Sequence, residues 1–206
     1  VGSYQRMVAI PKALAVEQTM DGGYIVAGFS YSMDGDLPLN QGGADVWVME
    51  LDINGAIEWS TTFGGSKDEE PHAIKQTPDG GYIIAGQTDS EDEMMYGNHG
   101  QVDAWVIKMD SLGSVEWKRI LGGSKWDIAW DVLLTGDNGF LVVGKSESSD
   151  GDVTENRGGP DYWVVKLNSI GLKEWRKTYG GGSVDIAYSG CNTNDGGFII
   201  AGSSSS

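Results

Sequence analysis

Two acidic loops of this chain carry oxygen-bearing side chains at a spacing that suits a hard cation. The first loop has Asp, Asp, Asn and Asp at its positions 1, 3, 7 and 12, and a later loop repeats these four residue types at the same positions. Carboxylate and amide oxygens at such positions are the ligands of calcium loops. The candidate calcium ligands are Asp34, Asp36, Asn40 and Asp45 in the first loop, and Asp150, Asp152, Asn156 and Asp161 in the later one.

The acidic loops depart from a calcium loop in several respects. Position 6 lacks glycine, and position 12 is Asp rather than a bidentate Glu. A third copy of the loop, in the middle of the chain, has Met94 where the others have their second Asp. Ordinary turns, in which Asp side chains accept hydrogen bonds from local backbone amides, explain the same residues without a metal. Calcium is therefore a candidate cofactor beside this simpler explanation, and no other cofactor is expected.

A second group of candidate residues is aromatic. One position of the repeat described below holds Leu14, His72, Trp130 and Tyr188, while the neighbouring positions are mostly small or aliphatic. Trp126, four residues before Trp130, has no tryptophan counterpart in the other repeats. Exposed aromatic rings can stack on sugars or anchor a peptide. Trp126, Trp130, His72 and Tyr188 are thus candidate binding residues, and the alternative is that their rings only fill an internal channel.

Sequence signatures of catalysis are missing. The two histidines, His72 and His99, do not form a zinc-protease pair, and the chain has neither a Gly-x-Ser-x-Gly motif nor a phosphate-binding loop. Paired carboxylates discriminate nothing in a chain with 30 acidic residues. We therefore expect a protein that is not an enzyme.

An internal repeat of 58 residues positions all of these candidates. The block DGGYIVAG begins at Asp21 and recurs in similar form from Asp79, Asp137 and Asp195, without insertion or deletion. Two further blocks keep the same step, and each contributes one tryptophan per repeat, for which we expect packing between repeats. These tryptophans are Trp47, Trp105 and Trp163 in one block and Trp59, Trp117 and Trp175 in the other.

Each repeat predicts four antiparallel strands. Runs such as Tyr-Ile-Ile-Ala and Val-Trp-Val-Ile-Lys are rich in β-branched and aromatic residues, and Asp-Gly-Gly turns bound them. Four strands per radial repeat predict the blades of an all-β propeller, with three complete repeats and a partial fourth. The long loops should share one end of the blades, where function is expected. The predicted repeats are roughly 13–70, 71–128, 129–186 and the partial 187–206, in one domain over 1–206 that is self-contained or part of a larger propeller.

The three blocks resemble the SBBP-type β-propeller repeats of bacteria and archaea, with their pattern GG-x3-D-x-A, DGGYIIAG and DxWVxKLD-x-x-G-x-x-x-W. The resemblance covers nearly the whole chain. Such repeats occur mostly in large secreted or cell-surface proteins, and no single activity belongs to them. The resemblance implies an extracellular or cell-surface location and a non-catalytic repeat scaffold or protein-interaction module. A carbohydrate-binding, lectin-like propeller and a non-catalytic domain of a larger secreted enzyme are the alternatives.

The charge of the chain narrows the choice of partner. A formal net charge of −16 repels phosphate backbones and anionic lipid headgroups, so we expect neither nucleic acid nor membrane insertion. The expected partner is a protein or a glycan at the long-loop face. The single cysteine, Cys191, excludes an internal disulfide. Without an 18-residue apolar stretch or a signal sequence, the chain is expected to be soluble, and either mature or a fragment.

Overall fold

The computed structural model describes residues 12–32, 40–92 and 95–206, and strands dominate this part of the chain. Its fourteen strands form three four-stranded antiparallel sheets and one two-stranded sheet. No described residue belongs to a helix that could cross a membrane. The strands are β1 (Lys12–Gln18), β2 (Tyr24–Ser30), β3 (Asp45–Leu51), β4 (Ile57–Phe63), β5 (Glu69–Gln76), β6 (Tyr82–Thr88), β7 (Asp103–Met109), β8 (Val115–Leu121), β9 (Asp127–Leu134), β10 (Phe140–Ser146), β11 (Asp161–Leu167), β12 (Lys173–Tyr179), β13 (Asp185–Asn192) and β14 (Phe198–Ser204).

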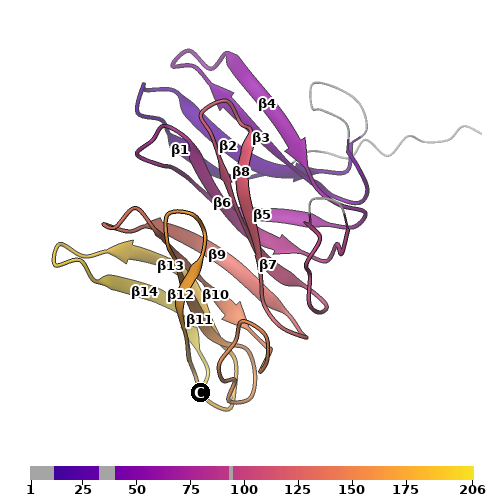
Figure 1. The fold of residues 1–206 in the computed structure, drawn as a ribbon, viewed down its shortest axis with the longest axis vertical. Coiled ribbons are helices and arrows are strands. Elements are labelled where there is room, and N and C mark those ends of the chain that lie inside the picture. The colour runs from indigo at the N-terminus through magenta and orange to yellow at the C-terminus, as the bar shows by residue number, and fades with distance from the viewer. Residues whose placement is uncertain (1–11, 33–39, 93–94) are drawn as a thin grey trace, which may run out of the picture.

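The sheets are the predicted blades. Blade 1 comprises β1–β4, blade 2 comprises β5–β8, blade 3 comprises β9–β12, and half-blade 4 is the hairpin β13–β14. Each strand pairs with its neighbour in the chain, so every blade is an antiparallel meander. In Figure 1 the blades follow one another in chain order, from the indigo and purple strands of blade 1 to the yellow half-blade 4. The all-β prediction of three complete units and a partial fourth is confirmed.

The hydrophobic core lies between the blades. Facing sheets bury aliphatic residues such as Val48 and Ile84 together with the central-strand tryptophans, of which Trp105 and Trp163 are almost fully buried. The outer-strand tryptophans pack against the turns of the following blade, where an added Cβ on Gly113 would lie 2.7 Å from the ring of Trp59. Burial of such large rings is the main stabilising contribution at each junction. Trp175, their counterpart in blade 3, is 39% exposed.

The first strand of every blade contains a β-bulge at the position of the variable aromatic residues. In blade 3, Ala129 pairs with Gly144 and Asp131 pairs with Val143, so Trp130 has no partner in the ladder. The same shift in register occurs in β1, β5 and β13. A bulge adds a residue to one strand and turns its side chain away from the regular alternation. The residues at the four bulges are Leu14, His72, Trp130 and Tyr188.

The bulge explains the last glycine of the DGGYIIAG block. A Cβ on Gly144 would lie only 1.8 Å from the backbone carbonyl oxygen of Ile128, a distance at which two atoms overlap. The equivalent distances are 1.9 Å at Gly28, 2.0 Å at Gly86 and 1.9 Å at Gly202. Only glycine lets the second strand approach the bulged first strand so closely. This glycine is therefore a requirement of the fold rather than of a ligand.

Candidate functional site

Three of the sequence-predicted binding residues come together where the first strands of the blades adjoin. Strand β5 lies beside β1 and β9, and β9 lies beside β13. The ring centroids of His72 and Trp130 are 4.2 Å apart, and those of Trp130 and Tyr188 are 5.9 Å apart. These distances are typical of interacting rings. The rings border an open groove of about 420 Å³, which we call the axial groove; it is also lined by Leu14, Lys75 and Asp131.

Two residues that line the axial groove each bury a polar ring atom within the described part of the chain. The Nε2 atom of His72 and the Nε1 atom of Trp130 are buried and have no hydrogen-bond partner there. Burial lowers the pKa of His72 to about 4, against the opposing effect of a hydrogen bond with Gln87, so its imidazole is neutral at pH 7. Asp131 is fixed, since its Oδ2 accepts hydrogen bonds from Ser189 Oγ and Gly190 N at 3.0 and 2.9 Å.

Trp126, the fourth predicted binding residue, lies apart from this groove. Its side chain is 42% exposed, and its Nε1 donates a hydrogen bond to Oε1 of Gln101. It lines a different cavity of about 150 Å³, whose other walls include Glu70 and Asp89. Sequence reasoning grouped Trp126 with Trp130 because they are four residues apart. In the structure they line two different cavities.

The later acidic loop uses its candidate calcium ligands in hydrogen bonds and ion pairs. The Nδ2 of Asn156 donates to the carbonyl oxygens of Ser146 and Gly159, both at 3.0 Å. The Oδ1 of Asp150 accepts a hydrogen bond of 2.8 Å from the backbone of Ser124 in the preceding inter-blade loop. Asp152 forms an ion pair with Lys173. These contacts tie the loop to neighbouring strands, as a structured turn would require.

The first acidic loop is partly outside the described residues, which do not include Asp34 and Asp36. Asn40 repeats the contacts of its counterpart, since its Nδ2 donates to the carbonyl oxygens of Ser30 and Gly43 at 2.8 and 2.6 Å. Asp45, at the start of β3, accepts a hydrogen bond from the backbone of Gln41. Calcium binding by these loops remains a prediction.

Calcium in the acidic loops has a measurable consequence. If the loops bind Ca²⁺, a chelator should lower the melting temperature, because a ligand that binds only the folded chain stabilises it. The substitution Asp152→Asn should then weaken binding at the later loop without unfolding the chain, because the ion pair that it removes is partly exposed and contributes only about 1 kcal/mol. Calorimetric titration of both proteins measures this. Melting curves that are identical in millimolar calcium and in chelator would leave the loops as ordinary turns.

A carboxylate pair is buried at every blade junction. At the second junction Oδ1 of Asp103 and Oδ2 of Asp127 face the same point, since a Cβ on Gly122 would lie 2.6 and 2.8 Å from them. Burial, helped by the Asp127 charge, raises the pKa of Asp103 to about 6. Burial likewise raises the pKa of Glu69, at the first junction, to about 7. The equivalent pairs are Asp45 with Glu69 and Asp161 with Asp185.

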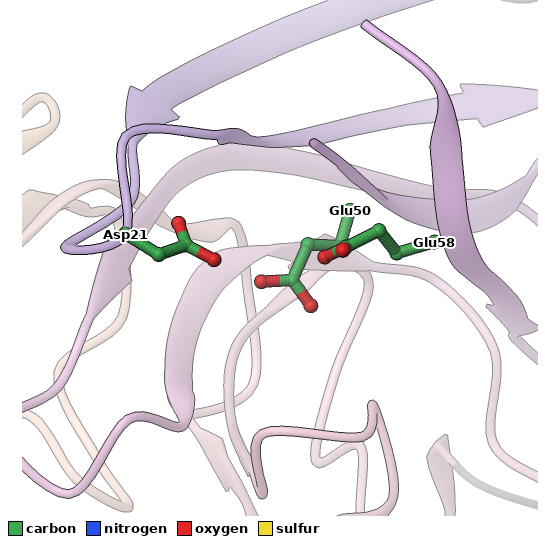
Figure 2. Close-up of side chains that lie close together, drawn as sticks. All are labelled: Asp21, Glu50 and Glu58. Atoms are coloured by element: carbon green, nitrogen blue, oxygen red, sulfur yellow. The ribbon is translucent and has the colours of Figure 1, made fainter. Parts of the chain in front are cut away.

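Sequence reasoning missed one further acidic group, at the opposite end of blade 1 from the long loops. Asp21 lies in the β1–β2 turn, Glu50 in β3 and Glu58 in β4, and their carboxylate oxygens lie within 4.8 Å of one another. Figure 2 shows the three side chains converging on one space. Among the described residues, no other group of three acidic, histidine or cysteine side chains meets this distance. The sequence contained a signal for this group, which is a reversal of charge at one repeat position. Glu50 stands where the other two complete repeats have a lysine, Lys108 or Lys166.

The fold and these sites define a class: a propeller-like all-β repeat protein with an aromatic axial groove. No family model matches this chain, and no curated protein matches its sequence. Among solved structures, a tryptophan-to-alanine mutant of Synechocystis apocarotenoid oxygenase is similar, with a TM-score of 0.43 and 15% identity over 82% of this chain and 38% of that one. An ACO/RPE65 chimera has the same TM-score and identity over 82% of this chain and 39% of the chimera. This chain thus spans well under half of those two chains.

Proposed function

We propose that this chain is a non-catalytic binding module of an extracellular or cell-surface repeat protein of the SBBP type, and that the axial groove is its binding surface. One observation carries the proposal: the bulge position differs in every blade, whereas the glycine opposite it is the same in all four. If this position had only a structural role, we would expect it to keep one residue type in a repeat of such constant length. A different side chain in each blade instead makes an asymmetric surface, which a specific partner can recognise.

The chemistry of the axial groove favours a protein segment with an apolar or aromatic side chain as the partner. Trp and Tyr are the residue types enriched where interfaces gain most of their affinity. With a net charge of −16, the chain should also attract basic partners and repel acidic ones.

A glycan is the second candidate partner. Stacking between a sugar ring and the half-exposed Tyr188 would use the same surface. The fixed carboxylate of Asp131, which lines the groove next to it, could accept hydrogen bonds from sugar hydroxyls. A peptide array would detect a protein segment, and a glycan array would detect a sugar.

Peptide and glycan arrays, followed by calorimetry of the best ligand, test the proposal with Trp130→Leu. Leucine is the residue of blade 1 at this position, so the bulge should be retained. We expect the variant to bind at least tenfold more weakly, because loss of a buried interface tryptophan costs about 2 kcal/mol or more. Trp126→Ala is the matched control, since Trp126 lines the other cavity, and it should leave the affinity unchanged.

The outcomes separate the alternatives. Binding lost in Trp130→Leu supports the axial groove, on whichever array the ligand appears. Binding lost only in Trp126→Ala would move the site to the long-loop face. Silence on both arrays would favour a purely structural repeat scaffold. Hydrolytic activity that persists through purification, and is lost in a variant of the groove, would overturn the non-catalytic assignment.

A further inference from the structure

The repeat supplies an internal comparison for the acidic group of blade 1, which we call the acid cluster (Asp21, Glu50 and Glu58). In blade 2 the repeat position of Glu50 is Lys108, whose Nζ lies 3.0 Å from Asp79 Oδ2 and 2.9 Å from Glu116 Oε2. Asp79 and Glu116 are the repeat equivalents of Asp21 and Glu58. In blade 2, the ammonium group of Lys108 therefore occupies the space between the two equivalent carboxylates.

Blade 3 holds its cation in the same way. Lys166 Nζ lies 2.9 Å from Asp137 Oδ2 and 3.0 Å from Glu174 Oε2, and it donates a third hydrogen bond, also of 3.0 Å, to the carbonyl oxygen of Leu167. Lys108 likewise donates to the carbonyl of Met109 at 3.0 Å. Two independent copies of this site thus surround a buried cation with two carboxylates and one carbonyl oxygen. Both lysine side chains are at least nine-tenths buried.

Blade 1 keeps the oxygen atoms of this site and replaces the ammonium with a third carboxylate. The bulge between Glu50 and Leu51 in the β3–β4 ladder leaves Glu58 unpaired, as the equivalent bulge does for Glu116. Gly23 allows the same close approach of the backbones as Gly81, since a Cβ on either would lie 2.3 Å from the facing carbonyl oxygen, that of Leu51 or of Met109. On Gly81 that Cβ would also lie 2.6 Å from Nζ of Lys108.

Glu50 itself is held inside the acid cluster. Its residue is only 8% exposed, and its Oε1 accepts a 2.5 Å hydrogen bond from the hydroxyl of Tyr82 in blade 2. Burial, followed by the Glu50 hydrogen bond and the surrounding negative charges, raises the pKa of Tyr82, which therefore stays a hydrogen-bond donor. Among the described residues, no lysine, arginine or histidine forms an ion pair with any of the three carboxylates, so their charges lack the compensation present in blades 2 and 3.

We propose that a hard divalent cation, Ca²⁺ in particular, binds between Asp21, Glu50 and Glu58, in the place that a lysine ammonium fills in blades 2 and 3. The three carboxylates and the carbonyl oxygen of Leu51 are the all-oxygen ligands that Ca²⁺ prefers. Calcium accepts irregular coordination, whereas Mg²⁺ demands a near-ideal octahedron, so a site shaped for an ammonium ion favours the larger cation. This site is distinct from the acidic loops, which lie at the other end of the blades.

Terbium luminescence tests the site directly, because Tb³⁺ substitutes for Ca²⁺ and is excited by nearby aromatic rings. Tyr82 is hydrogen-bonded to Glu50, and its ring centroid is 5.8 Å from that of Trp59. We expect terbium emission on aromatic excitation, competed by Ca²⁺ more strongly than by Mg²⁺. The substitution Glu50→Lys introduces the residue of blades 2 and 3, so it should abolish this emission component and lower the number of bound calcium ions by one.

Matched variants make the result specific. Glu58→Gln should weaken Ca²⁺ binding at least tenfold, whereas Glu116→Gln, the same change beside Lys108, should leave it unchanged. In chelator, Glu50→Lys should melt no lower than the wild type, because it restores an ion pair. Should that variant fail to fold, Glu50→Gln replaces it, with the same expected loss of binding. Emission and calcium stoichiometry that are the same in the wild type and in folded variants of Glu50 and Glu58 would overturn the site.

Discussion

Replacing Gly144 with alanine is expected to destabilise the chain by about 3 kcal/mol or more. The added methyl carbon would lie 1.8 Å from the carbonyl oxygen of Ile128 and 3.1 Å from Cα of Ala129. Both atoms belong to the backbone, which cannot move aside without breaking the β9–β10 ladder. Urea titration, followed by tryptophan fluorescence, measures the change in the free energy of unfolding.

Gly136→Ala is the control for this substitution. Gly136 lies in the β9–β10 turn, has no atom within 4 Å of the position of an added Cβ, and does not have a positive φ. Its replacement should change the free energy of unfolding by no more than about 1 kcal/mol, and the reduced freedom of the unfolded chain favours stabilisation. Equal stability of the two variants would contradict the explanation of the DGGYIIAG glycine by the bulge.

The second large effect expected is a loss of stability on acidification that depends on His72. Its pKa is about 4 in the folded chain and 6.5 as the ordinary value, so the fold favours the neutral imidazole. The stabilisation is complete above pH 6.5 and is lost as the pH falls towards 4. Between pH 8 and pH 5 the free energy of unfolding should fall by about 2 kcal/mol through this group. Urea titrations at the two pH values measure the loss.

His72→Leu isolates this contribution, because leucine is the residue of blade 1 at the same bulge. Lys75 and Asp131 also line the axial groove, and the variant leaves both in place. The pH-dependent loss should therefore shrink by about 2 kcal/mol in the variant. If the two proteins lose the same stability between pH 8 and pH 5, the loss belongs to other groups, such as the junction carboxylates.

The strands were predictable because their signals are local. A run such as Tyr82-Ile-Ile-Ala-Gly86 contains its own alternation and turn residues, and the 58-residue step confirms each assignment several times. The bulge at Trp130 was not predictable in this way, because register is a property of two strands together. The sequence showed only its two consequences, a variable residue on one strand and a glycine on the other.

The candidate sites were predicted less completely. His72, Trp130 and Tyr188 meet because neighbouring blades bring one repeat position together, which sequence periodicity can indicate. The spacing of Asp150 and Asp152 could not show that Ser124 and Lys173, far away in the chain, would be their partners. Glu50 differs from Lys108 and Lys166 only in the sign of its charge, which the apolar and glycine positions that define the repeat do not reveal.

If the axial groove binds a partner as proposed, the bulges separate recognition from folding. Each bulged residue lies outside the ladder, and the glycine opposite it keeps the backbone the same in every blade. The four bulge positions can therefore carry different side chains without a change in the fold. Duplication of a repeat followed by a single codon change at the bulge would alter the ligand while leaving the junctions intact. New specificities would then be selected without the loss of stability that usually accompanies mutations at binding sites.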